Sequence, residues 1–258
     1  MSRSDGLTLA VTGITGRMGG ETLSAARERG HEVFGLSRAG DRIDGFETYR
    51  VDEAAAALAE RAPDALVDFS VPEGSVQYLR ACAGTATPAV VGTTGFDEER
   101  AAFDRAAETV PVLKATNFAR GVETLKRLVR EAAASLEGYD VELTETHHNG
   151  KRDAPSGTAK SLLEALEEGA GERDQQYGRE GVHPRRPDEV GVHVRRAGTV
   201  RGEHELLFAA NDEVVTLTHR AESRRAFADG ALDAAEWLAG RPPGRYEFAD
   251  VLEDGGER

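Results

Sequence analysis

Cysteine and long apolar stretches are nearly absent from this chain of 258 residues. The single cysteine, Cys82, excludes an internal disulfide and a cysteine-based metal cluster, which is typical of proteins in a reducing compartment. No stretch approaches the roughly 18 uninterrupted apolar residues that a membrane-spanning helix needs, and Met1 to Gly6 lack the apolar core of a signal peptide. We therefore expect a cytoplasmic protein with no membrane partner.

Lysine is also scarce. It supplies only four of the 32 basic residues, whereas acidic residues number 46. The net charge of −14 argues against nucleic acid as a partner, because phosphate binding depends on concentrated Lys and Arg. A surface of this kind suggests a high-salt habitat or a GC-rich genome. Each remaining lysine is informative, because lysine, unlike arginine, can give up a proton.

The first half of the sequence alternates short apolar runs with longer helical patterns rich in Ala, Glu and Arg. Such runs, separated by helices, are typical of a parallel sheet covered on both faces, and right-handed crossovers then give a Rossmann-like, doubly wound α/β fold. The expected strands are Leu7–Thr12, Glu32–Leu36, Ala65–Phe69, Ala89–Gly92 and Val112–Ala115.

The pattern changes from about Val141. Four strand-like segments follow with one helix between them, near Ser156–Glu168, which predicts a second α+β domain with a mainly antiparallel open sheet. We expect Gly171–Glu189, rich in Gly, Pro and charge, to form a mobile loop, and Phe227–Ala239 to form a last amphipathic helix. The four segments are Val141–Thr146, Val190–Arg196, Glu203–Ala210 and Glu213–His219.

A glycine-rich turn with the spacing GxxGxxG follows the first predicted strand and precedes a helix pattern from Glu21 to Arg29. Glycines let the backbone approach a pyrophosphate, and the first N–H groups of a helix bind its negative charge. Loops after later strands lie at the same carboxyl edge of such a sheet, where ligands bind. The predicted dinucleotide-binding residues are Gly13, Ile14, Thr15, Gly16, Arg17, Met18, Gly92, Thr93, Thr94, Thr116, Asn117 and Phe118. The alternative is a purely structural turn.

The second predicted strand ends in Ser37-Arg38 rather than in the Asp or Glu that binds the ribose hydroxyls of NAD. A guanidinium pairs bidentately with phosphate, so Arg38 favours the 2′-phosphate of NADPH, with NADH still possible. The alternative is that Arg38 is an ordinary surface cation. Phe118 also offers an aromatic ring to pack on a nicotinamide.

The most polar part of the chain runs from Glu145 to Ala159. It contains the adjacent histidines His147 and His148, then Lys151, and then Ser156, which we expect to cap a helix. The first N–H groups of that helix, at Gly157 and Thr158, form a carboxylate site. An imidazole that gives a proton near neutral pH, a cation and an anion-binding helix start together suit a small anionic substrate.

Two other interpretations of this segment are open. One is a metal site made by Glu145, His147, His148 and Asp153. Neighbouring residues of a strand point to opposite faces, and no third histidine stands at ligand spacing, so we expect no metal. The other is a pair of surface histidines in a charged loop.

Short motifs along nearly the entire chain match, in order and spacing, those of one enzyme family. They are Gly13-x-x-Gly16-Arg17-Met18-Gly19, Asp68-Phe69-Ser70 with Pro72-Glu73, Gly92-Thr93-Thr94-Gly95-Phe96, Asn117-Phe118, His147-His148 with Lys151, Asp153 to Ala159, Arg196-Ala197-Gly198, Gly202-Glu203-His204 and the helix from Phe227. The chain thus resembles 4-hydroxy-tetrahydrodipicolinate reductase, also called dihydrodipicolinate reductase. The segment from the paired histidines to Thr158 is highly specific.

The resemblance implies NADPH-dependent reduction of 4-hydroxy-tetrahydrodipicolinate to tetrahydrodipicolinate, with loss of water, in the diaminopimelate pathway to lysine. It implies that His147 is the acid and that Lys151 assists proton donation. It further implies that His148 and the Gly157 and Thr158 amides hold the carboxylates of this small cyclic dicarboxylate.

The resemblance also implies a domain organisation. Residues 1–118, completed by 226–258, would form the dinucleotide-binding domain, and residues 119–225 a substrate-binding and oligomerisation domain. The second sheet would then build a homotetramer.

Some positions depart from the family pattern. Asn149-Gly150 stands where many members carry Arg-His, and Ser37 replaces the acidic residue of NADH-accepting members. Ala119, counted with the cofactor-binding residues, replaces the usual Ser. The residues alone leave two other functions open. Another NADP-linked amino-acid-pathway oxidoreductase would not need Lys151 together with the helix start, and a non-catalytic dinucleotide sensor would not need His147 with Lys151.

Overall fold

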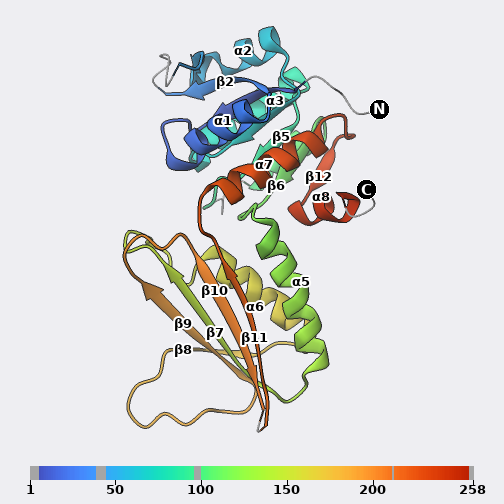
Figure 1. The fold of residues 1–258 in the computed structure, drawn as a ribbon. Coiled ribbons are helices and arrows are strands. Elements are labelled where there is room, and N and C mark those ends of the chain that lie inside the picture. The colour runs from blue at the N-terminus through green and yellow to red at the C-terminus, as the bar shows by residue number, and fades with distance from the viewer. Residues whose placement is uncertain (1–5, 39–44, 96–99, 211, 256–258) are drawn as a thin grey trace. The chain divides into compact units, whose positions relative to one another are not determined.

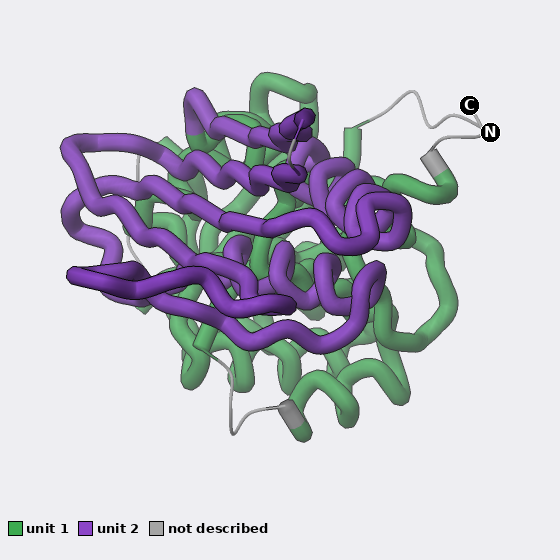
Figure 2. The backbone as a smooth tube through the Cα atoms, turned by 90° about the horizontal axis from the view of Figure 1, so that it is seen from below, with its two compact units in different colours: residues 1–119, 224–258 green, residues 120–223 purple. Residues whose placement is uncertain are grey.

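The computed structural model describes residues 6–38, 45–95, 100–210 and 212–255. Met1 to Asp5 and Phe96, which enter the arguments from sequence, lie outside the described residues. The chain divides into two compact units, coloured separately in Figure 2: unit 1 is Met1–Ala119 with Arg224–Arg258, and unit 2 is Arg120–Ser223. In the described part of the chain, no helix is both long enough and apolar enough to cross a bilayer.

Unit 1 is built on a seven-stranded sheet. Its strands are β1 (Thr8–Thr12), β2 (Glu32–Ser37), β3 (Thr48–Arg50), β4 (Ala65–Asp68), β5 (Ala89–Val91), β6 (Pro111–Lys114) and β12 (Gly244–Tyr246). They lie in the order β12-β6-β5-β4-β1-β2-β3, and every pairing is parallel (Figure 1), which confirms the predicted doubly wound fold. The chain winds away from β1 in both directions, so the topological switch point lies between β1 and β4.

Helices cover both faces of this sheet. They are α1 (Arg17–Glu28), α2 (Ala54–Arg61), α3 (Pro72–Thr85), α4 (Arg100–Ala107), α7 (Arg225–Leu238) and α8 (Phe248–Gly255), with a 3-10 turn at Val51–Glu53. One face packs against α2, α3 and α4 and the other against α1, α7 and α8. Neighbouring residues of β1 divide between the two faces, since Leu9 belongs to the second core and Ala10 to the first. Cys82 is buried in the first core, and burial raises the pKa of its thiol.

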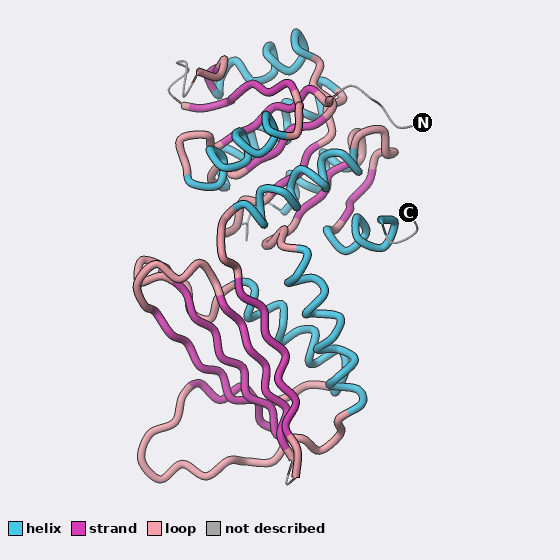
Figure 3. Tube along the Cα trace, viewed as in Figure 1, coloured by secondary structure: helices cyan, strands magenta, loops and turns pink. Residues whose placement is uncertain are grey.

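Unit 2 is a sheet covered by helices on one face. The elements are α5 (Arg120–Ser135), β7 (Asp140–His147), α6 (Gly157–Ala170), β8 (Asp174–Tyr177), β9 (Glu189–Arg196), β10 (Glu203–Ala209) and β11 (Val214–Arg220). The strand order is β11-β10-β7-β9-β8. β10 is antiparallel to both of its neighbours, whereas β9 is parallel to β7 and β8, so the sheet is mixed. α5 and α6 pack on one face of it (Figure 3).

β7 explains how polar groups reach the inside of unit 2. Its residues alternate strictly, so that Val141, Leu143, Glu145 and His147 are buried on the helix-covered face while the residues between them lie on the other face. The first two belong to the core around α5 and α6. The last two extend the same row, so β7 carries a carboxyl and an imidazole on its buried side.

The expected loop at Gly171–Glu189 is wrong in part, because residues Asp174–Tyr177 form the edge strand β8 beside β9. Its sequence, DQQY, is polar and largely exposed, so it lacks the apolar alternation that identifies a strand. The rest of the segment is held to β7 by ion pairs of Arg185 with Asp140, at 2.8 Å, and with Glu142. The short elements β3, β12 and α8 are also missing from the prediction.

Candidate active site

The predicted glycine turn joins β1 to α1, beside the switch point of the sheet. Gly13 has a φ of +65°, and a Cβ there would lie 2.2 Å from the carbonyl oxygen of Phe69, in the loop after β4. A Cβ on Gly19 would lie 2.3 Å from the Gly13 carbonyl oxygen. Within the described chain no side chain caps α1, and its first turn carries no acidic residue. The turn therefore has the close packing and the helix N–H groups that suit a pyrophosphate.

The other predicted cofactor residues follow the carboxyl ends of β2, β5 and β6. Because parallel strands end at one edge of a sheet, the structure brings these loops and the glycine turn to the same edge. Thr15, Gly16, Arg17, Arg38, Thr94 and Thr116 are exposed there, Gly13, Met18, Gly92 and Asn117 are half-buried, and Ile14, Thr93, Phe118 and Ala119 are buried. The buried members expose little side-chain surface.

Phe118 is one of these buried residues. Its ring is 2% exposed and packs edge-on against Phe69 and Phe248, with ring centroids 5.9 and 5.4 Å apart. A Cβ on Gly92 would lie 2.2 Å from the Phe69 ring, so glycine at that position accommodates the aromatic pair. The Phe118 ring is thus part of the core of unit 1, and its packing on a nicotinamide stays a prediction.

Asp68 ties the loops at this edge together. It is 1% exposed and accepts hydrogen bonds from the Thr12 and Ser75 hydroxyls, from the Thr93 hydroxyl at 3.1 Å and from the Ser70 N–H at 3.0 Å. These donors come from the end of β1, from α3 and from the loops after β5 and β4. Asp68 is not among the candidate site residues predicted from the sequence, although a carboxylate that ends a buried strand is a usable signal.

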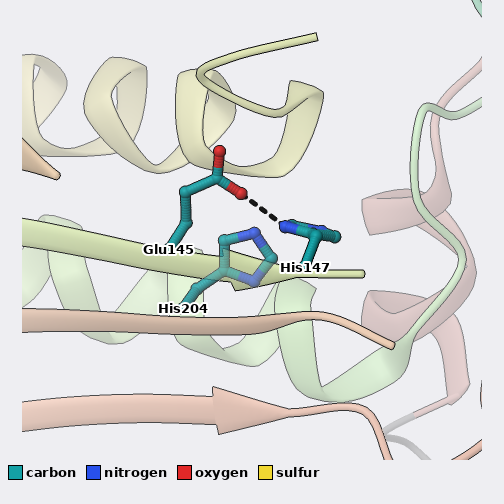
Figure 4. A group of neighbouring side chains, drawn as sticks. All are labelled: Glu145, His147 and His204. Atoms are coloured by element: carbon teal, nitrogen blue, oxygen red, sulfur yellow. Dashed lines mark ion pairs between the residues drawn. The ribbon is translucent and has the colours of Figure 1, made fainter. Parts of the chain in front are cut away.

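In unit 2, the buried side chains of Glu145 and His147 meet on β7. Oε2 of Glu145 lies 2.5 Å from Nδ1 of His147 (Figure 4). Its other oxygen, Oε1, accepts hydrogen bonds from the Arg196 guanidinium and the Ser156 N–H, each at 2.9 Å. Burial acts to raise the pKa of Glu145, but His147, Arg196 and the Ser156 N–H together outweigh it and lower the pKa to about 2. Glu145 is therefore ionised at neutral pH.

Sheet register brings two distant residues to this pair. Arg196 of β9 is paired with His147, and His204 of β10 is paired with Glu145, so each lies on the same face of the sheet as its partner. Nε2 of His204 is 3.1 Å from Oγ of Ser156. His204 is not among the candidate site residues predicted from the sequence. The available signal is its place in the buried row of β10, where a polar residue is unusual.

His204 is the most strongly buried histidine of this group. Burial, assisted by the nearby His147, lowers the pKa of His204 to about 3. Its ring stands edge-on to that of His147, with centroids 5.1 Å apart. His204 is therefore neutral at physiological pH.

Glu145, His147 and His204 each offer a ligand atom within 4.8 Å of the others, which would permit a metal ion. No third histidine stands at ligand spacing in the sequence of this segment, but strand register brings His204 beside Glu145. The donor set nevertheless suits a hydrogen-bonded network better. The Glu145 carboxylate already forms an ion pair with the Arg196 guanidinium, and this positive charge would repel a metal cation.

The predicted substrate residues lie where β7 ends and α6 begins. Ser156 caps α6, since its Oγ accepts the Ala159 N–H at 3.1 Å, which confirms the predicted cap. Gly157 is exposed at the first helical position, and Thr158 beside it is 9% exposed. In the preceding loop His148 is half-buried and Nζ of Lys151 forms an ion pair with Asp153 at 2.8 Å. One end of unit 2 therefore gathers an imidazole, a cation and a helix start.

A hollow of about 510 Å³ opens on the same unit, next to the start of β10. It is lined by Thr199, Val200, Arg201, Arg220, Ala221 and Glu222. The predicted substrate residues are not among these, so the hollow gives them no support. Its two arginines make it polar, and Arg220 is paired with Glu203 at 3.0 Å.

A doubly wound sheet with a glycine turn at its switch point, joined to an α+β unit with a carboxylate-held histidine, defines a two-domain dinucleotide-binding oxidoreductase. The family model described as dihydrodipicolinate reductase, N-terminus, matches residues 7–118, and that described as dihydrodipicolinate reductase, C-terminus, matches residues 121–252. The chain belongs to the dihydrodipicolinate reductase family, as the sequence motifs predict.

Individual relatives agree with this assignment. The 4-hydroxy-tetrahydrodipicolinate reductase of Natronomonas pharaonis is 54% identical over 248 residues, which are 95% of this chain and 100% of the relative. That of Haloarcula marismortui is 52% identical and covers 95% of this chain and 98% of its own.

The fold also matches solved structures. A dipicolinate-bound dihydrodipicolinate reductase from Paenisporosarcina sp. TG-14 has a TM-score of 0.77 at 22% identity, over 94% of this chain and 97% of its own. An amine dehydrogenase from Mycobacterium smegmatis has a TM-score of 0.62 at 14% identity, over 96% of this chain and 97% of its own. At these identities the likeness is one of fold.

Proposed function

We propose that this protein reduces 4-hydroxy-tetrahydrodipicolinate to tetrahydrodipicolinate, with loss of water, and prefers NADPH as the reductant. The observation that carries the proposal is the full-length identity above 50% with two relatives that bear this activity in their names. The buried His147–Glu145 pair beside a capped helix start supports it, because the reaction needs a proton donor and donors for carboxylates.

The chemistry consumes one hydride and one proton and releases one water. A bound reduced nicotinamide supplies the hydride. In our proposal His147 donates the proton, and Lys151, whose ammonium lies in the loop before α6, assists by stabilising negative charge. His148 and the N–H groups of Gly157 and Thr158 hold the substrate carboxylates, since a helix start favours anions.

The preference for NADPH rests on Arg38. This exposed residue directly follows β2, whose partner strand β1 leads into the glycine turn. No acidic side chain precedes it at Ser37, so the position suits a 2′-phosphate. We expect Arg38→Ala to raise KM for NADPH about tenfold, as for loss of a charge-assisted phosphate contact, and to leave KM for NADH nearly unchanged. Equal changes for both cofactors would contradict the preference.

The activity itself is tested by following the loss of NADPH absorbance. Pyruvate, aspartate semialdehyde and the condensing synthase generate the substrate in the same reaction mixture. The assay is run at low and at high salt, because the acidic surface suggests that the protein works in a high-salt habitat. We expect oxidation that depends on every component, and a fall in turnover of about 10²-fold or more in His147→Gln with little change in cofactor affinity. No turnover at either salt concentration, or NADPH-dependent reduction of other amino-acid-pathway substrates instead, would overturn the proposal.

We also propose that the protein acts as a cytoplasmic homotetramer assembled through the sheet of unit 2. The support is the family membership and the sheet face opposite to α5 and α6, where the residues of β7 are half-buried or exposed. Light scattering after gel filtration measures the oligomer, and a monomer at assay concentration would refute this part.

A further inference from the structure

We propose that Glu145 is a positioning residue, which holds the His147 ring through its Nδ1–H and so leaves Nε2 as the nitrogen that exchanges the catalytic proton. The inference rests on the proposed function, because it deepens the role that His147 has there. It concerns a residue pair that lies wholly within unit 2.

The pairing of the two atoms is specific. Nδ1 of His147 and Oε2 of Glu145 are 2.5 Å apart, and among the described residues neither atom has another hydrogen-bonding partner. An ionised carboxylate can only accept hydrogen bonds, so the proton between the two atoms belongs to Nδ1. The tautomer of a neutral His147 is thereby fixed.

The carboxylate is itself held in place. Arg196 and the Ser156 N–H both donate to Oε1, and Arg196 also donates to the backbone carbonyl of Asp153 at 2.6 Å. Ser156 caps α6, and Arg196 ends β9, so two elements fix the orientation of Glu145 on β7. The buried Glu145 carboxylate therefore has a fixed position, and the His147 ring keeps its hydrogen bond only in one orientation.

The other edge of the ring is kept clear. A Cβ on Gly202 would lie 3.2 Å from Nε2 of His147, so glycine leaves space beside this nitrogen that any other residue would fill. His204 lies edge-on to the ring, and its lowered pKa keeps it neutral, so it does not take up the proton that His147 exchanges. Nε2 is therefore the ring nitrogen available to a substrate.

The proton balance follows from this arrangement. When Nε2–H transfers its proton to the substrate, His147 becomes a neutral imidazole that keeps Nδ1–H, and solvent later returns a proton to Nε2. Glu145 stays ionised throughout and gains no proton. Orienting carboxylates of this kind can be worth up to about 10⁴-fold in turnover, because the wrong tautomer cannot perform the transfer.

Glu145→Gln tests the proposal. Glutamine keeps the size of the side chain and can still accept the Ser156 N–H, but its amide N–H₂ faces Nδ1 and favours the wrong tautomer. We expect kcat to fall about 10²-fold while KM for substrate and cofactor changes less than about threefold, as for loss of a group that acts only on proton transfer. A purely structural role would change thermal stability and both KM values instead.

A second readout does not depend on turnover. In protein labelled with ¹⁵N-histidine, His147→Gln identifies the His147 ring signals by their loss. We expect the native ring in its neutral form to carry its proton on Nδ1 and the ring in Glu145→Gln to carry it on Nε2. If glutamine prevents folding, Glu145→Asp keeps the charge beside Arg196 but withdraws it from Nδ1, and we expect a folded protein with reduced kcat.

A matched control exists in unit 1. His31 and Glu236 also form an imidazole–carboxylate pair, at 3.0 Å between Nε2 and Oε1, and His31 precedes the amino end of β2. Glu236→Gln should leave kcat unchanged.

Native kcat in both Glu145 variants, or an Nε2–H tautomer of His147 in the native protein, would overturn the inference. A native protein that lacks reductase activity but shows the expected tautomer would instead overturn the proposed function, while the positioning of the ring would stand.

Discussion

Replacing His204 with glutamine should make the protein less sensitive to acid. His204 is 3% exposed, and its pKa of about 3 lies far below the 6.5 of an unperturbed histidine. On acidification the unfolded chain takes up a proton at this residue near pH 6.5, whereas the folded chain resists protonation until about pH 3. Stability from this residue is thus present above pH 6.5 and is lost progressively as the pH falls towards 3.

The size of the effect follows from these two values. Between pH 7 and pH 5 the shift removes about 2 kcal/mol of stability, since each unit of pKa difference is worth about 1.4 kcal/mol once the unfolded form is protonated. Glu145 hardly contributes in this window, because its pKa of about 2 and unfolded value of 4.5 confine its effect to lower pH. Glutamine can still hydrogen-bond to Ser156 Oγ but does not titrate.

Urea unfolding followed by circular dichroism at pH 7, 6 and 5, at one protein concentration, measures the difference. The charged groups near His204, namely Glu145, His147, His219 and Lys151, are present in both proteins. Their effects on the free energy of unfolding should therefore cancel in the comparison. The native protein should therefore lose about 2 kcal/mol more than His204→Gln between pH 7 and pH 5. Equal losses in the two proteins would refute the assignment of a neutral, buried His204.

Three further outcomes are expected. Asp68→Asn should destabilise unit 1 by about 2–4 kcal/mol and weaken NADPH binding, because it removes charge-assisted hydrogen bonds that tie the loops together; urea unfolding and fluorescence titration measure both, and an unchanged affinity would contradict the role. Gly202→Ala should lower kcat more than about tenfold, because its Cβ contacts Nε2 of His147 and its φ of +157° favours glycine; native kcat would show that Nε2 is not the working edge. Cys82 should resist thiol reagents until the protein unfolds, because it is fully buried and its pKa is raised; rapid labelling of native protein would be inconsistent with this.

The parallel sheet of unit 1 could be predicted because its central strands are continuous apolar runs. Strands buried on both faces, such as Ala65–Asp68, have this signature, and the helices between them restrict the connections to right-handed crossovers. The edge strands β3, β8 and β12 could not be predicted, because they lack such continuous apolar runs. Each has three or four residues with little burial, so the hydrophobic pattern does not distinguish them from loops.

The site in unit 2 was predictable only where it is local in sequence. His147, Lys151 and Ser156 fall within one polar segment, so spacing and helix capping identify them together. Arg196 and His204 lie about 50 residues from the groups that they contact. They reach those groups through the register of β7 with β9 and β10, which alternation within a single strand does not specify.

Asp68 and Glu145 point to a common use of buried charge in this acidic chain. Removing a carboxylate from water costs several kcal/mol unless donors replace the lost hydration. Asp68 receives four donors and Glu145 two, with His147 Nδ1 as a third at the ion-pair distance. Each set comes from at least three separate segments of its unit, so each carboxylate fixes loops or strand ends that an apolar residue would leave unconnected. Buried acids at these two positions therefore organise their units, and each lies at the end of its unit where the predicted ligand-binding residues are found.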